Sequence, residues 1–258
     1  MENSENKTKS NKSAALIIIG NEILSGRTLD KNTQYIGQAC ADYGVALAEV
    51  RVVPDIEARI VGAVNEMRAE YDYVFTTGGI GPTHDDITAV CVARAFGAGF
   101  GRHVGAYEIL LAHYGAEELN EARASMADMP IYEDLDLILN PVSAAPGFRI
   151  ENVFVMAGVP RIMQAMFDHV LEMVEGGAAM VSRTVFVDAP ESHVAVILSD
   201  VQDAYKDVDI GSYPKFKADG GWSVSVVLRG VDVDRLKVVE DALVSVLGEN
   251  DVPVQIFE

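Results

Sequence analysis

The first part of the chain alternates short apolar runs with segments in which apolar residues recur at helical spacing. Three runs predict buried strands, at residues 14–20, 45–53 and 73–75. A helical pattern follows each run, over residues 32–44, 56–67 and 88–97. Strand and helix units in this order predict a parallel sheet with helices on both faces and right-handed crossovers.

The next segment continues the same pattern up to about residue 175. Residues 103–129 are predicted to be mainly helical, and strands are predicted at 135–140 and 152–158, with a turn-rich loop of small residues at 140–148 between them. A helix whose first turn holds Pro160 follows the last strand. We therefore expect a three-layer, mostly parallel α/β domain over residues 14–175.

The two ends of the chain differ from this central pattern. The opening "MENSENKTKSNKS" is polar and lacks the apolar stretch of a signal peptide, so residues 1–13 are predicted to be a disordered tail. After the Gly-Ala-rich segment 175–182 the order becomes strand, helix, strand, strand, helix, strand. This βαββαβ order predicts a second, smaller α+β domain of the ferredoxin-like type over residues 183–258.

Composition places the chain among soluble globular proteins. Hydrophobic residues make up 49% and charged residues 23% of the 258 positions, and no apolar run approaches the roughly 18 residues of a membrane span. Cys40 and Cys91 each lie inside an apolar helical pattern, which is typical of reduced core residues. We therefore expect a cytoplasmic protein that does not bind a membrane.

The formal net charge of −19 narrows the possible ligands. Nucleic-acid surfaces need clustered Lys and Arg, so we expect no nucleic-acid partner. An acidic field also repels an anionic small molecule. A phosphate ligand would therefore depend on backbone N–H groups and on a metal ion.

The segment "TTGGIGPTHDDIT", residues 76–88, is the strongest chemical signal in the sequence. It connects a buried strand to a helix, and such loops present N–H groups where the helix dipole favours anions. The absence of Cβ at Gly78, Gly79 and Gly81 allows a phosphate to approach the backbone closely. Asp85 or Asp86 beside a phosphate implies a divalent cation between them. The segment thus predicts a site for a phosphorylated ligand.

Two aspartates at strand ends are the candidate metal ligands. Ligands of parallel sheets bind beyond the carboxyl ends of the strands, and Asp55 and Asp86 follow strands that we expect to be adjacent. The two carboxylates would then converge on one ion. A second interpretation remains open, because Asp is favoured at helix N-caps. Thr83, Thr88, Glu22 and Asn32 have the same alternative as cap or loop residues.

Five motifs together resemble one family. "GNEILSGRTLDKN", "VVPD", "TTGGIGPTHDDIT", "NPVSAAPG" and "AGVPRIM" occur in the order and spacing of the molybdopterin-binding domain family. Within that family the chain is similar to the N-terminal region of the CinA-like competence/damage-inducible proteins over residues 14–175. The second domain, with "GSYP" at 211–214, resembles the small middle domain of the same proteins. The C-terminal deamidase domain of full-length members has no counterpart in this sequence.

The resemblance implies a set of functional residues. Asp86 and Asp55 match the family's catalytic aspartates and, with Glu22, would hold a divalent metal ion such as Mg, Mn or Co. The pterin or nucleotide phosphate would be bound by residues of the remaining motifs: Ser25, Gly26, Asn32, Gly78, Gly79, Ile80, Gly81, Thr83, Thr88, Asn140 and Gly147. A homo-oligomer is the expectation for the family.

Three functions follow from this set. We favour metal-dependent hydrolysis of a nucleotide pyrophosphate, of the ADP-ribose or FAD class. The alternatives are a molybdopterin-binding protein of molybdenum-cofactor metabolism and a non-catalytic regulatory homologue. The sequence departs from the family pattern at Asn21, where an aspartate is frequent, and at Ser143 and Ala144, where Gly and Thr are expected.

Overall fold

The computed structural model describes residues 12–218 and 220–256, which form two compact units, Met1–Gly177 and Ala178–Glu258. Most of the predicted tail lies outside the described residues. The prediction was wrong for Lys12 and Ser13, which begin the first strand because both bind the carboxylate of Asp72.

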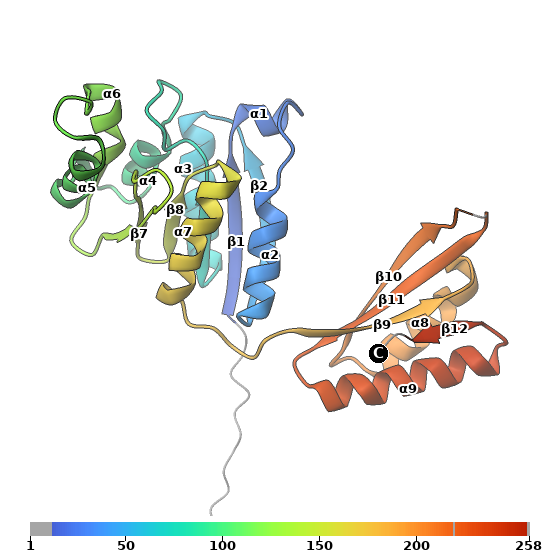
Figure 1. Cartoon of the computed structure of the whole chain (residues 1–258). Coiled ribbons are helices and arrows are strands. Elements are labelled where there is room, and N and C mark those ends of the chain that lie inside the picture. The colour runs from blue at the N-terminus through green and yellow to red at the C-terminus, as the bar shows by residue number, and fades with distance from the viewer. Residues whose placement is uncertain (1–11, 219, 257–258) are drawn as a thin grey trace, which may run out of the picture. The chain divides into compact units, whose positions relative to one another are not determined.

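The first unit is built on a six-stranded, mostly parallel sheet (Figure 1). Its order is β2-β1-β3-β8-β7-β6. The parallel strands are β2 Val45–Val53, β1 Lys12–Ile19, β3 Tyr73–Thr77 and β8 Val153–Met156. Two short strands, β7 Gly147–Ile150 and β6 Asp136–Ile138, extend the sheet with antiparallel pairing. The predicted fold class is confirmed.

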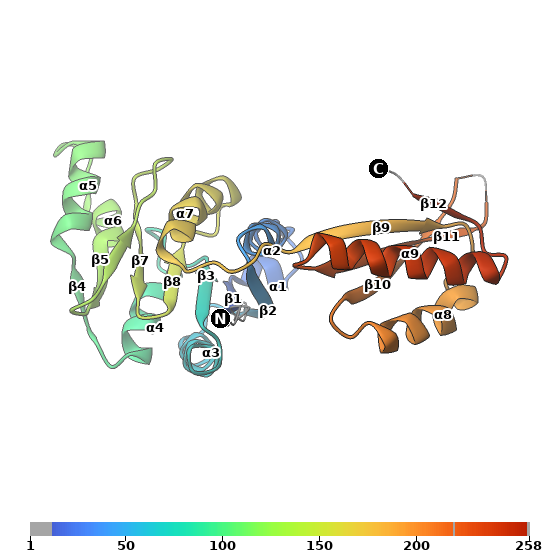
Figure 2. The ribbon, with the colours of Figure 1, turned by 90° about the horizontal axis from the view of Figure 1, so that it is seen from below.

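Helices cover both faces of this sheet, giving three layers (Figure 2). One face carries α2 Asn32–Asp42 and α7 Pro160–Met173, and the other carries α3 Glu57–Glu70 and α4 Thr88–Ala95. A one-turn helix, α1 Asn21–Leu24, follows β1. Each face has its own buried apolar core, one containing Cys40 and the other Cys91. Both cysteines are unpaired, as predicted, and burial raises their pKa to about 12 and about 11.

The segment predicted as mainly helical, residues 103–129, does contain helices, but it is flanked by two short strands that were not predicted. Helices α5 Val104–Tyr114 and α6 Glu121–Ala124 and the 3-10 turn η1 Ser125–Ala127 lie between β4 Gly99–Arg102 and β5 Asp128–Ile131, which pair antiparallel. Strand β7 was not predicted, and its first two residues lie in the segment predicted as a loop. It forms because Gly147 lets it pass close to β8, where a Cβ would lie 2.1 Å from the carbonyl oxygen of Val155.

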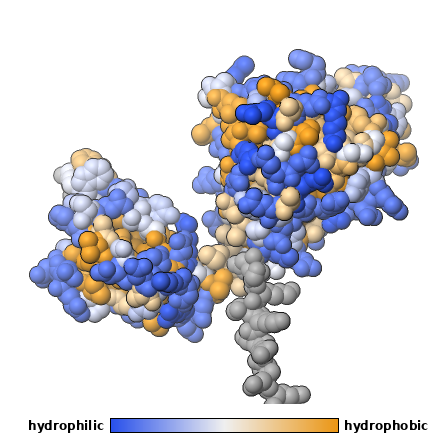
Figure 3. All heavy atoms as spheres, turned by 180° about the vertical axis from the view of Figure 1, so that it is seen from behind, coloured by the Kyte–Doolittle hydropathy of each residue, from blue (hydrophilic) through white to orange (hydrophobic). Residues whose placement is uncertain are grey.

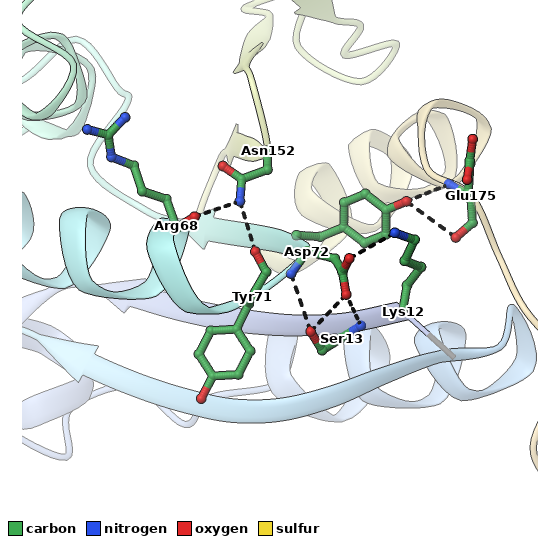
Figure 4. A network of polar contacts seen from close by, with 8 residues as sticks. Lys12, Ser13, Arg68, Tyr71, Asp72, Asn152 and Glu175 are labelled. Carbon is green, nitrogen blue, oxygen red and sulfur yellow. Dashed lines mark hydrogen bonds and ion pairs between the residues drawn. The ribbon is translucent and has the colours of Figure 1, made fainter. Parts of the chain in front are cut away.

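Polar side chains join the strands and helices at the amino-terminal end of the sheet (Figure 4). Asp72, just before β3, accepts hydrogen bonds from the Ser13 N–H and the Lys12 ammonium, both at 2.9 Å. These contacts lower the pKa of Asp72 to about 2. Asn152, just before β8, donates to the carbonyls of Arg68 and Tyr71 at 3.0 and 2.9 Å, which closes the end of α3.

The second unit is a βαββαβ sandwich. Its elements are β9 Val181–Val187, α8 Glu191–Ala204, β10 Asp209–Phe216, β11 Trp222–Gly230, α9 Val233–Glu249 and β12 Val254–Ile256. The sheet order β10-β11-β9-β12, with antiparallel neighbours, is that of a ferredoxin-like fold. Both helices pack on one apolar core. The carboxylate of Glu240 is buried there and paired with Arg183 and Lys237, so its pKa is lowered.

Figure 3 shows hydrophilic residues over much of the visible surface of each unit, with hydrophobic residues in patches between them. Within the described ranges, no helix is long and apolar enough to cross a membrane.

Candidate ligand-binding site at the carboxyl end of the parallel sheet

A cavity of about 640 Å³ lies where the central parallel strands of the first unit end. The chain runs from β1 outward to β2 and then returns to the other side of β1 for β3, so the strand order reverses between β1 and β3. Ligands of open α/β sheets bind at such a switch point. The cavity walls come from the loops after β1, β3, β6 and β8, from the start of α7 and from the segment between α5 and η1. The lining residues are Glu22, Thr28, Gly78–Pro82, Asp86, Tyr114, Arg123, Met126, Asn140, Ser143, Ala145, Ala157–Pro160 and Ile162.

The glycine loop after β3 lines this cavity, and positive φ values shape its backbone. Gly78 and Gly79 have φ of +102° and +67°, and a Cβ on Gly78 would lie 2.1 Å from the carbonyl oxygen of Ile19. In the part of the chain that the structure describes, the N–H groups of Gly79, Ile80 and Gly81 have no hydrogen-bond acceptor. Successive N–H groups in a turn form a concave site for an anion. The loop predicted to bind phosphate therefore carries three consecutive N–H groups that have no acceptor among the described residues.

Thr88 holds the loop in this conformation. Its buried hydroxyl donates to the carbonyl of Gly78 at 2.9 Å, and its N–H donates to the carbonyl of Gly79 at 2.9 Å. A Cβ on Gly79 would lie 2.2 Å from the Thr88 hydroxyl oxygen. Thr88 is therefore a positioning residue that ties the loop to the first turn of α4, and it does not line the cavity.

Asp86 lines the cavity and is not a helix cap. Its Oδ2 accepts the N–H of Thr83 at 2.8 Å, and the Thr83 hydroxyl lies 2.6 Å from it. The N-cap of α4 is Ile87, and no side chain caps it. The same Thr83 hydroxyl lies 2.6 Å from Asp85, whose pKa it lowers, but Asp85 is exposed and outside the cavity wall. The two neighbouring aspartates therefore differ in their access to a ligand.

Asp55 is not brought into the cavity wall. Strand β1 lies between β2 and β3, so the expectation that Asp55 and Asp86 follow adjacent strands was wrong. Asp55 does not cap α3 either, since the N-cap is Ile56. Its Oδ2 accepts the N–H of Asn21 at 2.8 Å, at the start of α1. This bond anchors the helical turn that carries Glu22 to the cavity.

The carboxylates do not assemble into one large metal cluster. Among the described residues there is no group of three or more His, Cys, Asp or Glu side chains arranged to hold a metal ion. Glu22 and Asp86 do line the same cavity. Mg²⁺ is typically held by one or two carboxylates together with substrate phosphates and waters. Glu22 and Asp86 fit that kind of shared site, whereas Asp55 lies outside it.

Of the other predicted site residues, some line the cavity and some lie outside its wall. Asn140 lines the cavity, but its amide is satisfied within its own loop by Ser143, Val142 and Ala145. Asn32 is buried and donates to the carbonyl of Gly158 at 2.8 Å. It is not a cap, because Asp30 accepts the N–H groups at the start of α2. Four further predicted residues do not line the cavity: Ser25, Gly26, Thr83 and Gly147.

Three residues of the cavity wall were not expected from the sequence. Tyr114, Arg123 and Met126 come from the segment predicted only as helical. The Arg123 guanidinium lies 4.4 Å over the Tyr114 ring and donates to the carbonyl of Glu118 at 2.7 Å. An aromatic residue and an arginine in one amphipathic segment carry no signal of their own, because the same residues are common on exposed helices. Gly158 and Val159 also line the cavity. They belong to the motif "AGVPRIM", in which no residue was predicted to contact a ligand.

Comparisons with known proteins cover both units. Residues 15–176 match the probable molybdopterin binding domain, and residues 179–255 match the FAD synthase middle domain. A protein of Archaeoglobus fulgidus is 36% identical over 222 residues, which cover 86% of this chain and 92% of that protein. A probable FAD synthase of Caenorhabditis briggsae is 30% identical over 80% of this chain, but this chain covers only 44% of that protein. The crystal structure of the protein CinA from Thermoplasma acidophilum superposes with a TM-score of 0.59 at 32% identity, covering 64% of this chain and 98% of that one.

Proposed function

Since the chain belongs to the molybdopterin-binding domain family, we propose that its cavity binds the phosphates of a nucleotide and that it hydrolyses the pyrophosphate of an ADP-ribose or FAD class substrate. In this reaction a water oxygen forms a bond to one phosphorus, and the bond from that phosphorus to the bridging oxygen breaks. The products are AMP and a second phosphate monoester.

The three unpartnered N–H groups of Gly79, Ile80 and Gly81 carry the proposal. They lie on the wall of a cavity whose 640 Å³ is in the range of nucleotide-sized ligand sites. Donors fixed in advance at the position of a phosphate stabilise charge that develops on its oxygens during the reaction. The chain's net charge of −19 makes such fixed donors necessary for binding an anion.

Asp86 and Glu22 are the residues that would hold a divalent metal ion, which when bound polarises a phosphoryl oxygen and lowers the pKa of a bound water. Thr83 orients Asp86, because both its N–H and its hydroxyl contact the Asp86 carboxylate. Asp55 orients the turn that carries Glu22. We assign Asp55 a positioning role for this reason, in place of the direct metal role expected from its motif.

A second candidate is binding of a pterin phosphate without hydrolysis, which the match to the probable molybdopterin binding domain favours. The glycine loop would serve the same purpose. The wall of Tyr114, Met126 and Ile162 offers an aromatic and two apolar side chains to a flat ring in either case.

Adjacent aspartates give a matched test. We would incubate the full chain with ADP-ribose or FAD and Mg²⁺, Mn²⁺ or Co²⁺, and measure release of AMP. Asp86→Asn should lower kcat at least about 100-fold, because a ligand of the catalytic metal is lost. Asp85→Asn removes the same charge one residue away, outside the cavity wall, and should change kcat less than about threefold.

Equal effects of the two variants would contradict the role of Asp86. Absence of AMP release from both substrates with all three metals would reject hydrolysis. Tight binding of a pterin phosphate by the same preparation would then support the second candidate.

A further inference from the structure

A small side pocket opens from the ligand cavity between the ends of β1, β3 and β8. Its volume is about 40 Å³, and Glu22, Thr28, Gly158 and Pro160 line both the side pocket and the main cavity. A space of this size holds a water molecule or one small group of a ligand. The side pocket is therefore a recess of the proposed substrate site.

Two buried polar atoms on its wall have no partner. The Oδ1 of Asn32 and the Oγ1 of Thr77 accept or donate no hydrogen bond within the described residues, although the two residues are only 6% and 1% exposed. Both residues line the side pocket. Buried polar atoms are rarely left unpaired in folded proteins, since their lost hydration is not compensated. Their presence on one recess points to a missing hydrogen-bond partner.

The chemistry of these atoms defines that partner. The Asn32 amide nitrogen donates to the carbonyl of Gly158 at 2.8 Å, which fixes the opposite oxygen as an acceptor. The carboxylate of Glu22 adds further acceptors, and the Thr77 hydroxyl either donates or accepts. A wall of this kind suits a neutral group that mainly donates and also accepts, which describes a hydroxyl.

We propose that the side pocket receives a ribose hydroxyl of the bound nucleotide, so that the site selects ribonucleotides over deoxyribonucleotides. The inference rests on the proposed nucleotide site and names the sugar that the site recognises. A site built to hydrogen-bond a hydroxyl rejects an analogue without it, because the buried acceptors then stay unpaired.

Neighbouring threonines provide a matched pair of variants. Thr76 and Thr77 are both fully buried on β3, and both hydroxyls lack a partner in the described part of the chain. Only Thr77 lines the side pocket. Val has nearly the same shape, so Thr77→Val and Thr76→Val each remove one unpaired hydroxyl and should leave the fold intact.

The test is isothermal titration of the full chain, with Mg²⁺ present, using two sets of probes. One set is AMP, 2′-deoxy-AMP and 3′-deoxy-AMP, and the other is ribose 5-phosphate and 2-deoxyribose 5-phosphate. We expect the wild type to bind the ribose form about tenfold more tightly than a deoxy form in at least one set. Thr77→Val should reduce that preference to about threefold or less, and Thr76→Val should preserve it.

Equal affinity of ribose and deoxy forms in both sets, or no binding of any probe, would overturn the inference, as would equal effects of the two variants. Hydrolysis is tested separately. A chain that prefers ribose but releases no AMP from ADP-ribose or FAD would refute the proposed hydrolysis and keep the sugar selection.

Discussion

Polar groups at the two ends of the six-stranded sheet differ in whether they have hydrogen-bond partners. At the amino-terminal end, the Asp72 carboxylate accepts hydrogen bonds from Lys12 and Ser13, and the Asn152 amide nitrogen donates to two backbone carbonyls (Figure 4). At the carboxyl end, three consecutive N–H groups and the side-chain oxygens of Asn32 and Thr77 have no partner within the described residues. One end contributes stability through its own hydrogen bonds, and the other carries the unpaired donors and acceptors of the proposed site. Unpaired groups in one place are therefore better evidence of a site than polar residues as such.

The largest effect on stability is expected for Gly78, which shapes the glycine loop at the carboxyl end of the sheet. Gly78→Ala should lower the free energy of unfolding by more than about 3 kcal/mol, because its Cβ would lie 2.1 Å from the Ile19 carbonyl at a φ of +102°. Gly26→Ala is the control, since its φ is +70° but nothing lies within 4 Å of a Cβ there. It should cost about 1 kcal/mol. Urea unfolding of both variants measures the difference, and similar losses would show that the close approach of Gly78 is unimportant.

An intermediate effect on stability is expected for Asn152, at the amino-terminal end of the sheet. Asn152→Ala removes the two hydrogen bonds to the carbonyls of Arg68 and Tyr71, and should lower the free energy of unfolding by about 2 kcal/mol. AMP affinity should stay within about twofold of the wild type, because the residue is at the opposite end of the strands from the cavity. Titration and urea unfolding check both parts. A loss of AMP affinity beyond tenfold would show that the two ends are coupled.

The smallest effect is the pH dependence of the stability that Asp72 contributes at the amino-terminal end. The folded-state pKa of Asp72 is lowered from 3.8 to about 2, first by the hydrogen bond from Lys12. A lowered pKa stabilises the fold above the unfolded value, and that stability is lost as pH falls from about 4 towards 2. Because the Asp72 side chain is 37% exposed, solvent reduces the effect to about 1 kcal/mol or less.

The difference in unfolding free energy between the wild type and Asp72→Asn isolates this contribution. It should be largest above pH 4 and shrink between pH 4 and pH 2. A difference that does not change with pH over this range would mean that the Lys12 and Ser13 contacts do not act through the charge of Asp72.

Local pattern was sufficient to predict the elements that form the sheet. The runs that became β1 and β2 are long and apolar, and the helices after them repeat apolar residues along one face. Strand β7 was missed because its four residues directly follow a turn-rich loop, so they show neither a long apolar run nor a clear alternation. The order of strands is not encoded in any local pattern, which is why Asp55 and Asp86 were expected side by side although β1 separates their strands.

The part of the candidate site that the sequence indicates is the loop whose backbone conformation favours glycine. The loop containing Gly78 and Gly79 has positive φ at both residues, which the run of glycines indicated. Asn32 could not be read in the same way, because a polar residue at a helix start is typical of a cap. Its actual partner, the carbonyl of Gly158, is 126 positions away in the sequence. Contacts over such distances depend on the assembled sheet.

The most direct test of the difference between the two ends is a titration of the ¹⁵N-labelled chain with AMP and Mg²⁺, followed by the backbone amide shifts. The amides of Gly79, Ile80 and Gly81 should move furthest and downfield, because each gains an anionic acceptor. The amides of Ser13 and Glu175 should stay in place, because each already donates to a protein acceptor. Unchanged amides in the glycine loop, or the largest shifts at the amino-terminal end, would contradict the account.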